Sequence, residues 1–271
     1  NSVQLISLSF TTTNEKFCKI LMMKRVFPFS SFQRTHLFAD YRFLGVDMHS
    51  HILPGIDDGA KNVTESLALV SGLKELGFES LFATPHVITD RYPNTPATII
   101  EAMDLLCTNL PLESKPVQLA AAAEYMMDDG FGALIGGGKL LTLPGNRVLV
   151  ELSYIAASPG AEDQIFQLCI GGYIPVMAHP ERYQYWHRSA DQFSRLIDIG
   201  CELQVNLLSL AGYYGKGVER CAHQLVEAGM VSFIGTDLHN NGQLEVIRTA
   251  LSSKKIARLF SKHQFKNISL V

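Results

Sequence analysis

The stretch V-D-M-H-S-H-I-L-P-G-I-D-D-G-A, residues 46–60, decides how the rest of the chain is interpreted. Residues 44–48 predict a short buried strand, and His49 and His51 follow at its end. Side chains alternate along an extended chain, so residues two apart point in the same direction. We therefore expect the two imidazoles to point at one place.

Pro54 and Gly55 then turn the chain, and Asp57 and Asp58 bring two carboxylates back toward the histidines. Neutral imidazole together with carboxylate is a ligand set that suits Zn, Mn or Fe rather than a metal that prefers thiolates. An isolated H-x-H motif is weak evidence in a chain with 9 histidines. The hypothesis of a metal site therefore depends on what recurs further along the chain.

The composition is that of an ordinary soluble enzyme, which fits one large domain or two. The chain has 271 residues, of which 47% are hydrophobic and 18% charged, and its net charge is -3. This balance gives no reason to expect nucleic acid as a partner or insertion into a membrane. The 5 cysteines are scattered, odd in number and without C-x-x-C spacing. Free thiols of this kind indicate a reducing, cytoplasmic compartment.

Residues 1–43 differ from the rest and are expected to form a poorly ordered N-terminal extension before a domain of residues 44–271. They are rich in Ser, Thr, Phe and basic residues and show no clear periodicity. A cleavable signal peptide over residues 20–29 is an alternative interpretation. These residues have neither a long apolar core nor a small-residue cleavage site, so we favour a simple extension.

Segments with strand character alternate with segments of helix character over the rest of the chain, as in repeated β-α units around a parallel sheet. The seven predicted strands are residues 44–48, 80–84, 117–123, 147–150, 174–178, 201–205 and 231–235. Polar residues able to bind metals stand just after six of them. In a closed β/α barrel these positions meet at the carboxyl-end face, where barrel enzymes keep their active sites. The pattern therefore predicts an α/β fold of this kind, resembling a TIM barrel.

The strand ends supply a set of candidate metal ligands, all of them histidine or carboxylate. They are His49, His51, Asp58, His86, Glu124, Glu151, His179, Asp237 and His239. One divalent ion takes roughly four to six donors, so this set suits two or three ions. Such a cluster lowers the pKa of a bound water and neutralises charge on a phosphoryl or carbonyl oxygen.

Within this set some roles are left open. Glu124 and Glu151 end neighbouring central strands and are the natural bridging ligands. Asp58 is the preferred ligand of the D-D-G turn, although Asp57 is an alternative, with the other aspartate then supporting a ligand. Asp47 points away from the histidine side and is expected to orient an imidazole from behind.

Arg182 lies three residues after His179, in a loop on the same face. Its fork of donors matches a phosphate group bidentately, so it is a candidate for binding a substrate oxyanion. The alternative is a surface ion pair with Glu181 or Asp191. The aromatic residues that follow are expected either to line a substrate mouth or to pack in the core: Tyr183, Tyr185 and Trp186.

The motifs H-S-H, T-P-H, a glutamate after the third strand, A-H-P-E-R-Y and T-D-L-H together resemble the PHP (polymerase and histidinol phosphatase) superfamily. The longer stretches F-A-T-P-H, V-L-V-E-L, M-A-H-P-E-R-Y and the opening stretch resemble one group within it. This group is the bacterial PHP-type tyrosine-protein phosphatases of capsule and exopolysaccharide operons (the CpsB, CapC and YwqE type). The resemblance covers residues 46–239.

This resemblance implies a distorted seven-stranded barrel with a trinuclear, usually manganese, centre, with Fe, Zn, Co or Mg as alternatives. It implies that the nine residues above are metal ligands and that Arg182 binds the substrate phosphate. Arg182, His51 and Asp237 are the expected catalytic residues. The implied partner is the phosphotyrosine-containing tail of a bacterial tyrosine kinase that regulates polysaccharide synthesis, and a homo-oligomer is left open.

The mechanism expected from these residues is in-line attack on phosphorus by a metal-activated hydroxide. Thiol-based phosphatase chemistry is excluded, because it needs a cysteine followed by five residues and an arginine, and none of the 5 cysteines has one. Two alternatives remain. One is a small-molecule phosphomonoesterase acting on a compound such as histidinol phosphate. The other is a non-catalytic module that binds metal and recognises phosphotyrosine.

Overall fold

The computed structural model describes residues 38–271, except 113–115, 139, 157 and 188. The strands are β1 (Val46–Ser50), β2 (Ser80–Ala83), β3 (His86–Val87), β4 (Gln118–Ala121), β5 (Glu124–Met126), β6 (Arg147–Glu151), β7 (Ile174–Ala178), β8 (Glu202–Asn206) and β9 (Phe233–Gly235). The α-helices are α1 (Val63–Glu75), α2 (Pro96–Thr108), α3 (Phe131–Gly137), α4 (Ala161–Ile170), α5 (Ala190–Asp198), α6 (Leu207–Leu210), α7 (Lys216–Glu227), α8 (Asn241–Ala250) and α9 (Lys254–Phe260).

The strands pair in parallel and form two sheets, in the orders β1-β2-β4 and β3-β5-β6-β7-β8-β9. The short strands β3 and β5 were not predicted as separate elements. Thr84 and Pro85 separate β3 from β2, and residues 122–123 separate β5 from β4. Pro85 has no N–H to give to a ladder, so a break at this point is expected on physical grounds. The second and third predicted strands are thus each continued by a short strand in the other sheet.

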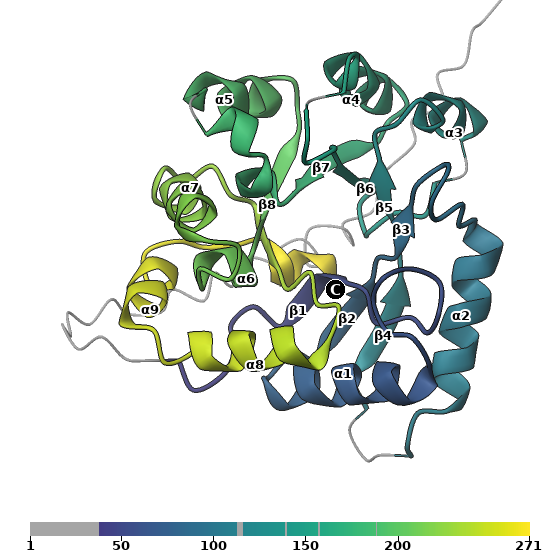
Figure 1. Ribbon diagram of the computed structural model, residues 1–271, viewed down its shortest axis with the longest axis vertical. Helices are drawn as coiled ribbons and strands as arrows, with labels where there is room; N and C mark the ends of the chain where they lie inside the picture. Colours follow the sequence, from purple (N-terminus) through teal and green to yellow (C-terminus); the bar gives the residue numbers. More distant parts are fainter. Residues whose placement is uncertain (1–37, 113–115, 139, 157, 188) are drawn as a thin grey trace, which may run out of the picture. The chain divides into compact units, whose positions relative to one another are not determined.

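The two sheets are joined where β1 meets the segment after β9. Ser50 forms a parallel bridge with Leu238. The His51 N–H donates to the Leu238 carbonyl at 2.9 Å, and the Asp237 N–H donates to the His49 carbonyl at 2.8 Å. Helices surround the strands (Figure 1). The structure is therefore a distorted parallel β/α barrel, and the predicted fold class is confirmed.

Hydrophobic residues fill two regions of this barrel. The smaller cluster contains side chains from strands on several sides, including Met48, Phe82, Leu149 and Phe233. The larger cluster includes apolar residues of the helices such as Leu73 of α1, and it packs the helices against the strands. Among the described residues, no helix is both long and apolar enough to cross a membrane. The strands are thus rigidly supported on both faces, which holds the residues at their ends in place.

Apolar residues recur at helical spacing over about residues 243–260, but the structure does not form one continuous helix there. The structure has two helices there, α8 and α9, with a turn between them. Ser253 caps the second helix, because its side chain accepts a hydrogen bond from the Ile256 N–H. Serine is preferred at an N-cap over a helix interior, so Ser253 indicates the start of a second helix. The periodicity of the apolar residues alone does not show this break.

Residues 1–37, most of the predicted N-terminal extension, lie outside the described residues, and they include the signal-peptide alternative of residues 20–29. The remaining residues of that segment pack on the barrel. Tyr41 is 1% exposed, and its ring stacks on Phe78 with centroids 5.5 Å apart. Its hydroxyl donates to the Ile247 carbonyl of α8 at 2.8 Å. Tyr41 thus joins the start of the described chain to its C-terminal part.

We expect Tyr41→Phe to lower the free energy of unfolding by about 1 kcal/mol, because the ring stays packed while the Ile247 carbonyl loses its donor. Urea denaturation followed by circular dichroism measures this difference. Tyr213→Phe is the matched control, since Tyr213 is 47% exposed. Equal stability of the two variants would show that the Tyr41 hydroxyl contributes nothing.

Candidate metal centre

The strand ends bring all nine predicted ligands into one place. Within the described residues, three groups of donor atoms each have all their atoms within 4.8 Å of one another. The groups are His49, Glu124, His179 and Asp237; His51, Asp58, His86 and His239; and His86, Glu124 and Glu151. Glu124 and His86 each occur in two groups, so the groups adjoin. We call this set the nine-residue cluster.

The deepest group surrounds Glu124, at the start of β5. His179 Nε2 lies 2.9 Å from Glu124 Oε1, and His49 Nε2 lies 3.2 Å from Glu124 Oε2. Asp237 Oδ1 lies 3.4 Å from His49 Nε2. Burial alone would lower the pKa of His49, but Glu124 and Asp237 overcome this effect and raise it. The centre of this group therefore favours positive charge.

The outer groups are closer to solvent and share the same carboxylates. His86 Nδ1 lies 2.9 Å from Glu151 Oε1 and 3.1 Å from Glu124 Oε2. Asp58 Oδ1 lies 3.4 Å from His86 Nε2 and 3.5 Å from His239 Nε2. The hydrogen bond with His239 is the main reason that the pKa of Asp58 falls far below its ordinary value. Glu124 thus contacts both the deep and the outer donors, where a bridging ligand would stand.

The chemistry of the donors fits metal ions. His49 Nδ1 lies 2.9 Å from Gln204 Oε1, and His51 Nδ1 lies 2.8 Å from Asp57 Oδ2. These oxygens only accept, so each Nδ1 carries a proton and each Nε2 is left to bind a cation. The two Nε2 atoms face each other at 3.2 Å.

Buried oxygen atoms in the cluster also lack partners. Within the described part of the chain, both carboxylate oxygens of Glu151 and Oε2 of Glu124 accept no hydrogen bond. Buried carboxylate oxygens without a hydrogen bond are costly even beside a histidine, and divalent ions would remove that cost. The cluster therefore fits divalent metal ions, and imidazole with carboxylate suits Mn, Fe or Zn.

The two aspartates of the D-D-G turn occupy different positions. Asp57 is buried behind His51 and accepts from His51 Nδ1 and, at 2.9 Å, from the Gly59 N–H. Burial would raise the pKa of Asp57, but the neighbouring His51 lowers it, so the carboxylate stays ionised. Asp58 instead belongs to the outer group of donors. The geometry thus favours Asp58 as the ligand and Asp57 as the residue that orients His51.

The expectation that Asp47 orients an imidazole is wrong. Its carboxylate accepts from the Thr236 N–H at 3.0 Å and from the Thr236 hydroxyl. Burial raises the pKa of Asp47 to about 6. Gln204 of β8, which the sequence did not single out, holds the His49 ring instead.

Arg182 belongs to the cluster's surroundings, because its Nη1 donates to Asp237 Oδ2 at 2.8 Å. Its guanidinium carbon lies 4.4 Å from the centroid of the Tyr154 ring and 4.2 Å from that of Tyr214. Burial alone would lower the pKa of Arg182, but Asp237 raises it, so the group is a permanent cation. The alternative of a surface pair with Glu181 is wrong, since Glu181 is buried and accepts from the Asn206 N–H at 3.0 Å.

The aromatic residues after Arg182 pack in the core. Tyr183 is 0% exposed; its hydroxyl accepts from the Leu152 N–H at 2.9 Å and donates to the Ala178 carbonyl. Trp186 is buried against Phe193 in an edge-to-face arrangement. Of the two expectations for these residues, packing is therefore the observed one for Tyr183 and Trp186, and Tyr154 and Tyr214 flank the site in their place.

A cavity of about 470 Å³ opens over the nine-residue cluster. Its walls include Arg91, Tyr92, Tyr154, Ile155, Arg182 and Tyr214, together with cluster residues such as His86 and Asp237. Several candidate metal ligands, the Arg182 guanidinium and the aromatic side chains therefore line the same cavity.

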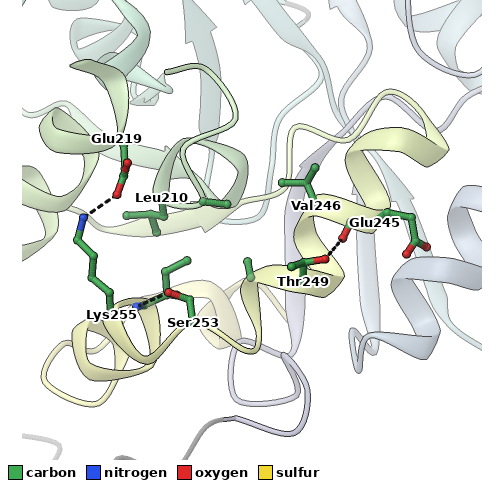
Figure 2. Close-up of a pocket in the computed structure, with 10 residues that line it drawn as sticks. Leu210, Glu219, Glu245, Val246, Thr249, Ser253 and Lys255 are labelled. Carbon is green, nitrogen blue, oxygen red and sulfur yellow. Dashed lines mark hydrogen bonds and ion pairs between the residues drawn. The ribbon is translucent and has the colours of Figure 1, made fainter. Parts of the chain in front are cut away.

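A second cavity, of about 390 Å³, lies away from this site, between α6 and α7 on one side and α8 and α9 on the other (Figure 2). Its walls include Leu210 and Val246, and Lys255 pairs with Glu219 at 2.7 Å beside them. None of the cluster residues lines it. Its one close ion pair is satisfied internally, so it offers no comparable chemistry.

Comparison with known proteins shows the family of the chain. A family model described as capsular polysaccharide synthesis, CpsB/CapC, matches residues 45–269. The tyrosine-protein phosphatase YwqE of Bacillus subtilis is 32% identical over 196 residues, which are 72% of this chain and 77% of YwqE. The tyrosine-protein phosphatase CpsB of Streptococcus pneumoniae is 27% identical over 231 residues, 79% of this chain and 94% of CpsB.

A solved structure supports the same relationship. It comes from the crystal structures of YwqE from Bacillus subtilis and CpsB from Streptococcus pneumoniae, described as unique metal-dependent tyrosine phosphatases. It is similar to this chain with a TM-score of 0.69 and 28% identity, over 81% of this chain and 96% of that chain. The family resemblance inferred from the motifs is thus confirmed, and the chain belongs to the CpsB/CapC family of capsular polysaccharide synthesis.

Proposed function

We propose that this chain is a metal-dependent protein-tyrosine phosphatase, with the nine residues of the cluster as its metal ligands and Arg182 as its phosphate-binding residue. The observation that carries the proposal is the shared cavity. It joins donors for more than one divalent ion to a permanent cation held between two tyrosines. The activity of the relatives YwqE and CpsB supports the choice of phosphotyrosine as substrate.

One divalent ion takes roughly four to six donors, so the nine residues would hold two or three ions, with manganese expected. When bound, these ions would supply Lewis acidity and a water of lowered pKa. The protein's own residues prepare the substrate. Arg182 would hold two phosphate oxygens with its fork of donors, while Asp237 and the flanking tyrosines prevent the fork from turning away. His51 is held by Asp57 so that its Nε2 faces the reacting centre.

The expected reaction is an in-line displacement in which water attacks phosphorus and the bond from phosphorus to the tyrosine oxygen breaks. No covalent phosphoenzyme forms. The leaving group is a phenolate, whose conjugate acid has a pKa of about 10, so it departs without a strong general acid. Tyr154 stacks on the Arg182 guanidinium, and burial raises the pKa of its hydroxyl well above the ordinary value. It therefore remains a hydrogen-bond donor throughout the working pH range.

The family's link with capsular polysaccharide synthesis supports a more specific substrate. We take this substrate to be the phosphotyrosine-containing tail of a tyrosine kinase that regulates the pathway. We also propose that this chain acts in the cytoplasm. Free cysteines at positions 107, 169, 201 and 221 agree with a reducing compartment. We also propose that residues 44–271 make up the phosphatase domain.

The test is hydrolysis of a phosphotyrosine peptide and of histidinol phosphate, each with Mn²⁺ and then with EDTA. We expect turnover of the peptide that EDTA abolishes and Mn²⁺ restores, because Arg182 can hold the phosphate but only a bound metal ion would lower the pKa of the attacking water. Preference for histidinol phosphate would identify a small-molecule phosphatase instead. Tight peptide binding without turnover would identify a recognition module, and both results would contradict the proposal.

A further inference from the structure

Two buried amide side chains in β8 connect two members of the deepest donor group, His49 and Asp237. Gln204 and Asn206 are both 0% exposed and lie two residues apart on the same face of the strand. Gln204 Oε1 lies 2.9 Å from His49 Nδ1, and Gln204 Nε2 donates to Asn206 Oδ1 at 2.7 Å. Asn206 Nδ2 then donates to Asp237 Oδ2 at 2.7 Å. An unbroken chain of hydrogen bonds therefore runs from His49 to Asp237.

The donor and acceptor of every hydrogen bond in this chain are fixed by the carboxylate of Asp237 at its end. Oδ2 of Asp237 already accepts from Arg182 Nη1 at 2.8 Å, and a carboxylate paired with a guanidinium can only accept hydrogen bonds. Asn206 must therefore turn its NH₂ toward Asp237 and its oxygen toward Gln204. Gln204 must in turn donate to Asn206 and present its own oxygen to His49. The ring nitrogen Nδ1 of His49 must then carry a proton.

The consequence at each end is a defined ligand atom. With Nδ1 protonated and held, His49 offers Nε2 to the cluster. At the other end, Asn206 Nδ2 and Arg182 Nη1 both occupy Oδ2 of Asp237. Only Oδ1 of Asp237 remains free, and it lies 3.4 Å from His49 Nε2 and 3.4 Å from His51 Nε2.

We propose that Gln204 and Asn206 are positioning residues that orient His49 and Asp237 for metal binding and tie both to Arg182. This inference rests on the proposed function, because it takes His49 and Asp237 as ligands. Partners that orient a metal ligand typically contribute about 10- to 100-fold in metal affinity. The amides touch neither the cavity nor the proposed substrate; they act through the residues that they hold.

The experiment measures Mn²⁺ affinity by titrating the metal-free protein and following free Mn²⁺ by electron paramagnetic resonance. Gln204→Met keeps the length of the side chain but removes its hydrogen bonds, and Asn206→Ala removes the link to Asp237. We expect each to weaken Mn²⁺ binding by roughly 10- to 100-fold. Gln118→Met, at an exposed glutamine of β4, is the matched control and should bind as the wild type does.

The double variant tests the chain itself. If the two amides act as one unit, Gln204→Met with Asn206→Ala should bind Mn²⁺ no more than about threefold more weakly than the worse single variant. A purely structural contribution from each residue would instead make the two losses multiply. Multiplied losses would therefore overturn the inference.

A conservative variant guards against a loss caused by poor folding. In Gln204→Glu the new carboxylate still accepts from His49 Nδ1 but can no longer donate to Asn206 Oδ1, so Mn²⁺ affinity should lie between those of the wild type and Gln204→Met. A loss equal to that of Gln204→Met, or normal affinity in Gln204→Met itself, would overturn the inference. Failure of the wild type to bind Mn²⁺ would overturn the proposed function as well, so the two failures are distinguishable.

Discussion

Replacing His179 with alanine is expected to abolish phosphatase activity and to weaken metal binding at the same time. His179 is 1% exposed and contacts Glu124, which belongs to two of the three donor groups. Losing a direct ligand should cost at least the roughly 100-fold in affinity seen when a ligand's supporting partner is lost. Because Glu124 also contacts the outer donors, we expect metal content to fall at more than one position.

Two measurements check this prediction. Metal analysis of the purified variant should show depleted Mn²⁺, and the rise in melting temperature on adding Mn²⁺ should shrink, since that rise depends on metal affinity. His223→Ala is a matched control, because His223 is also buried but lies near the Leu210 carbonyl, at 3.1 Å. It should lose stability while keeping its metal. Full activity in His179→Ala would refute the assignment of this site.

That the nine residues meet in one place was predictable, because it depends on a simple rule of topology. In a parallel barrel each strand end reaches the same face, so a histidine or carboxylate just after a predicted strand is placed without knowledge of packing. His49, His86, Glu151 and Asp237 could all be found in this way. The choice between Asp57 and Asp58 could not, because it depends on the path of a turn in which adjacent side chains diverge.

The residues that support the ligands were not predictable from the sequence. Gln204 and Asn206 lie in a strand whose pattern only indicated burial, and amides have no spacing rule that identifies a partner. Tyr154 and Tyr214 come from loops far apart in the sequence and meet only because both loops pass over Arg182. Asp47 was predicted to orient an imidazole because alternation along the strand places it behind the histidines. The His49 imidazole is held by Gln204 instead.

Replacing Arg182 with alanine is expected to lower kcat/KM for a phosphotyrosine peptide by roughly 10²- to 10³-fold, the effect of losing one preorganised charge stabiliser. Metal content should stay near the wild-type level. Asp237 would keep the donor Asn206 on its Oδ2 atom, so its Oδ1 atom should remain aimed at the cluster. Steady-state kinetics and metal analysis on the same preparation separate these two effects. An unchanged kcat/KM would refute a role for Arg182 in binding phosphate.

Arg182→Lys makes the prediction more specific. Lysine keeps the positive charge but lacks the planar fork that donates to two phosphate oxygens and stacks between Tyr154 and Tyr214. If geometry matters beyond charge, this variant should recover only part of the lost activity. Arg195→Ala is the control, since Arg195 forms an exposed pair with Glu162 at 2.8 Å and should leave turnover unchanged. Full recovery by lysine would mean that charge alone is required, and that the two tyrosines serve packing rather than the orientation of the fork.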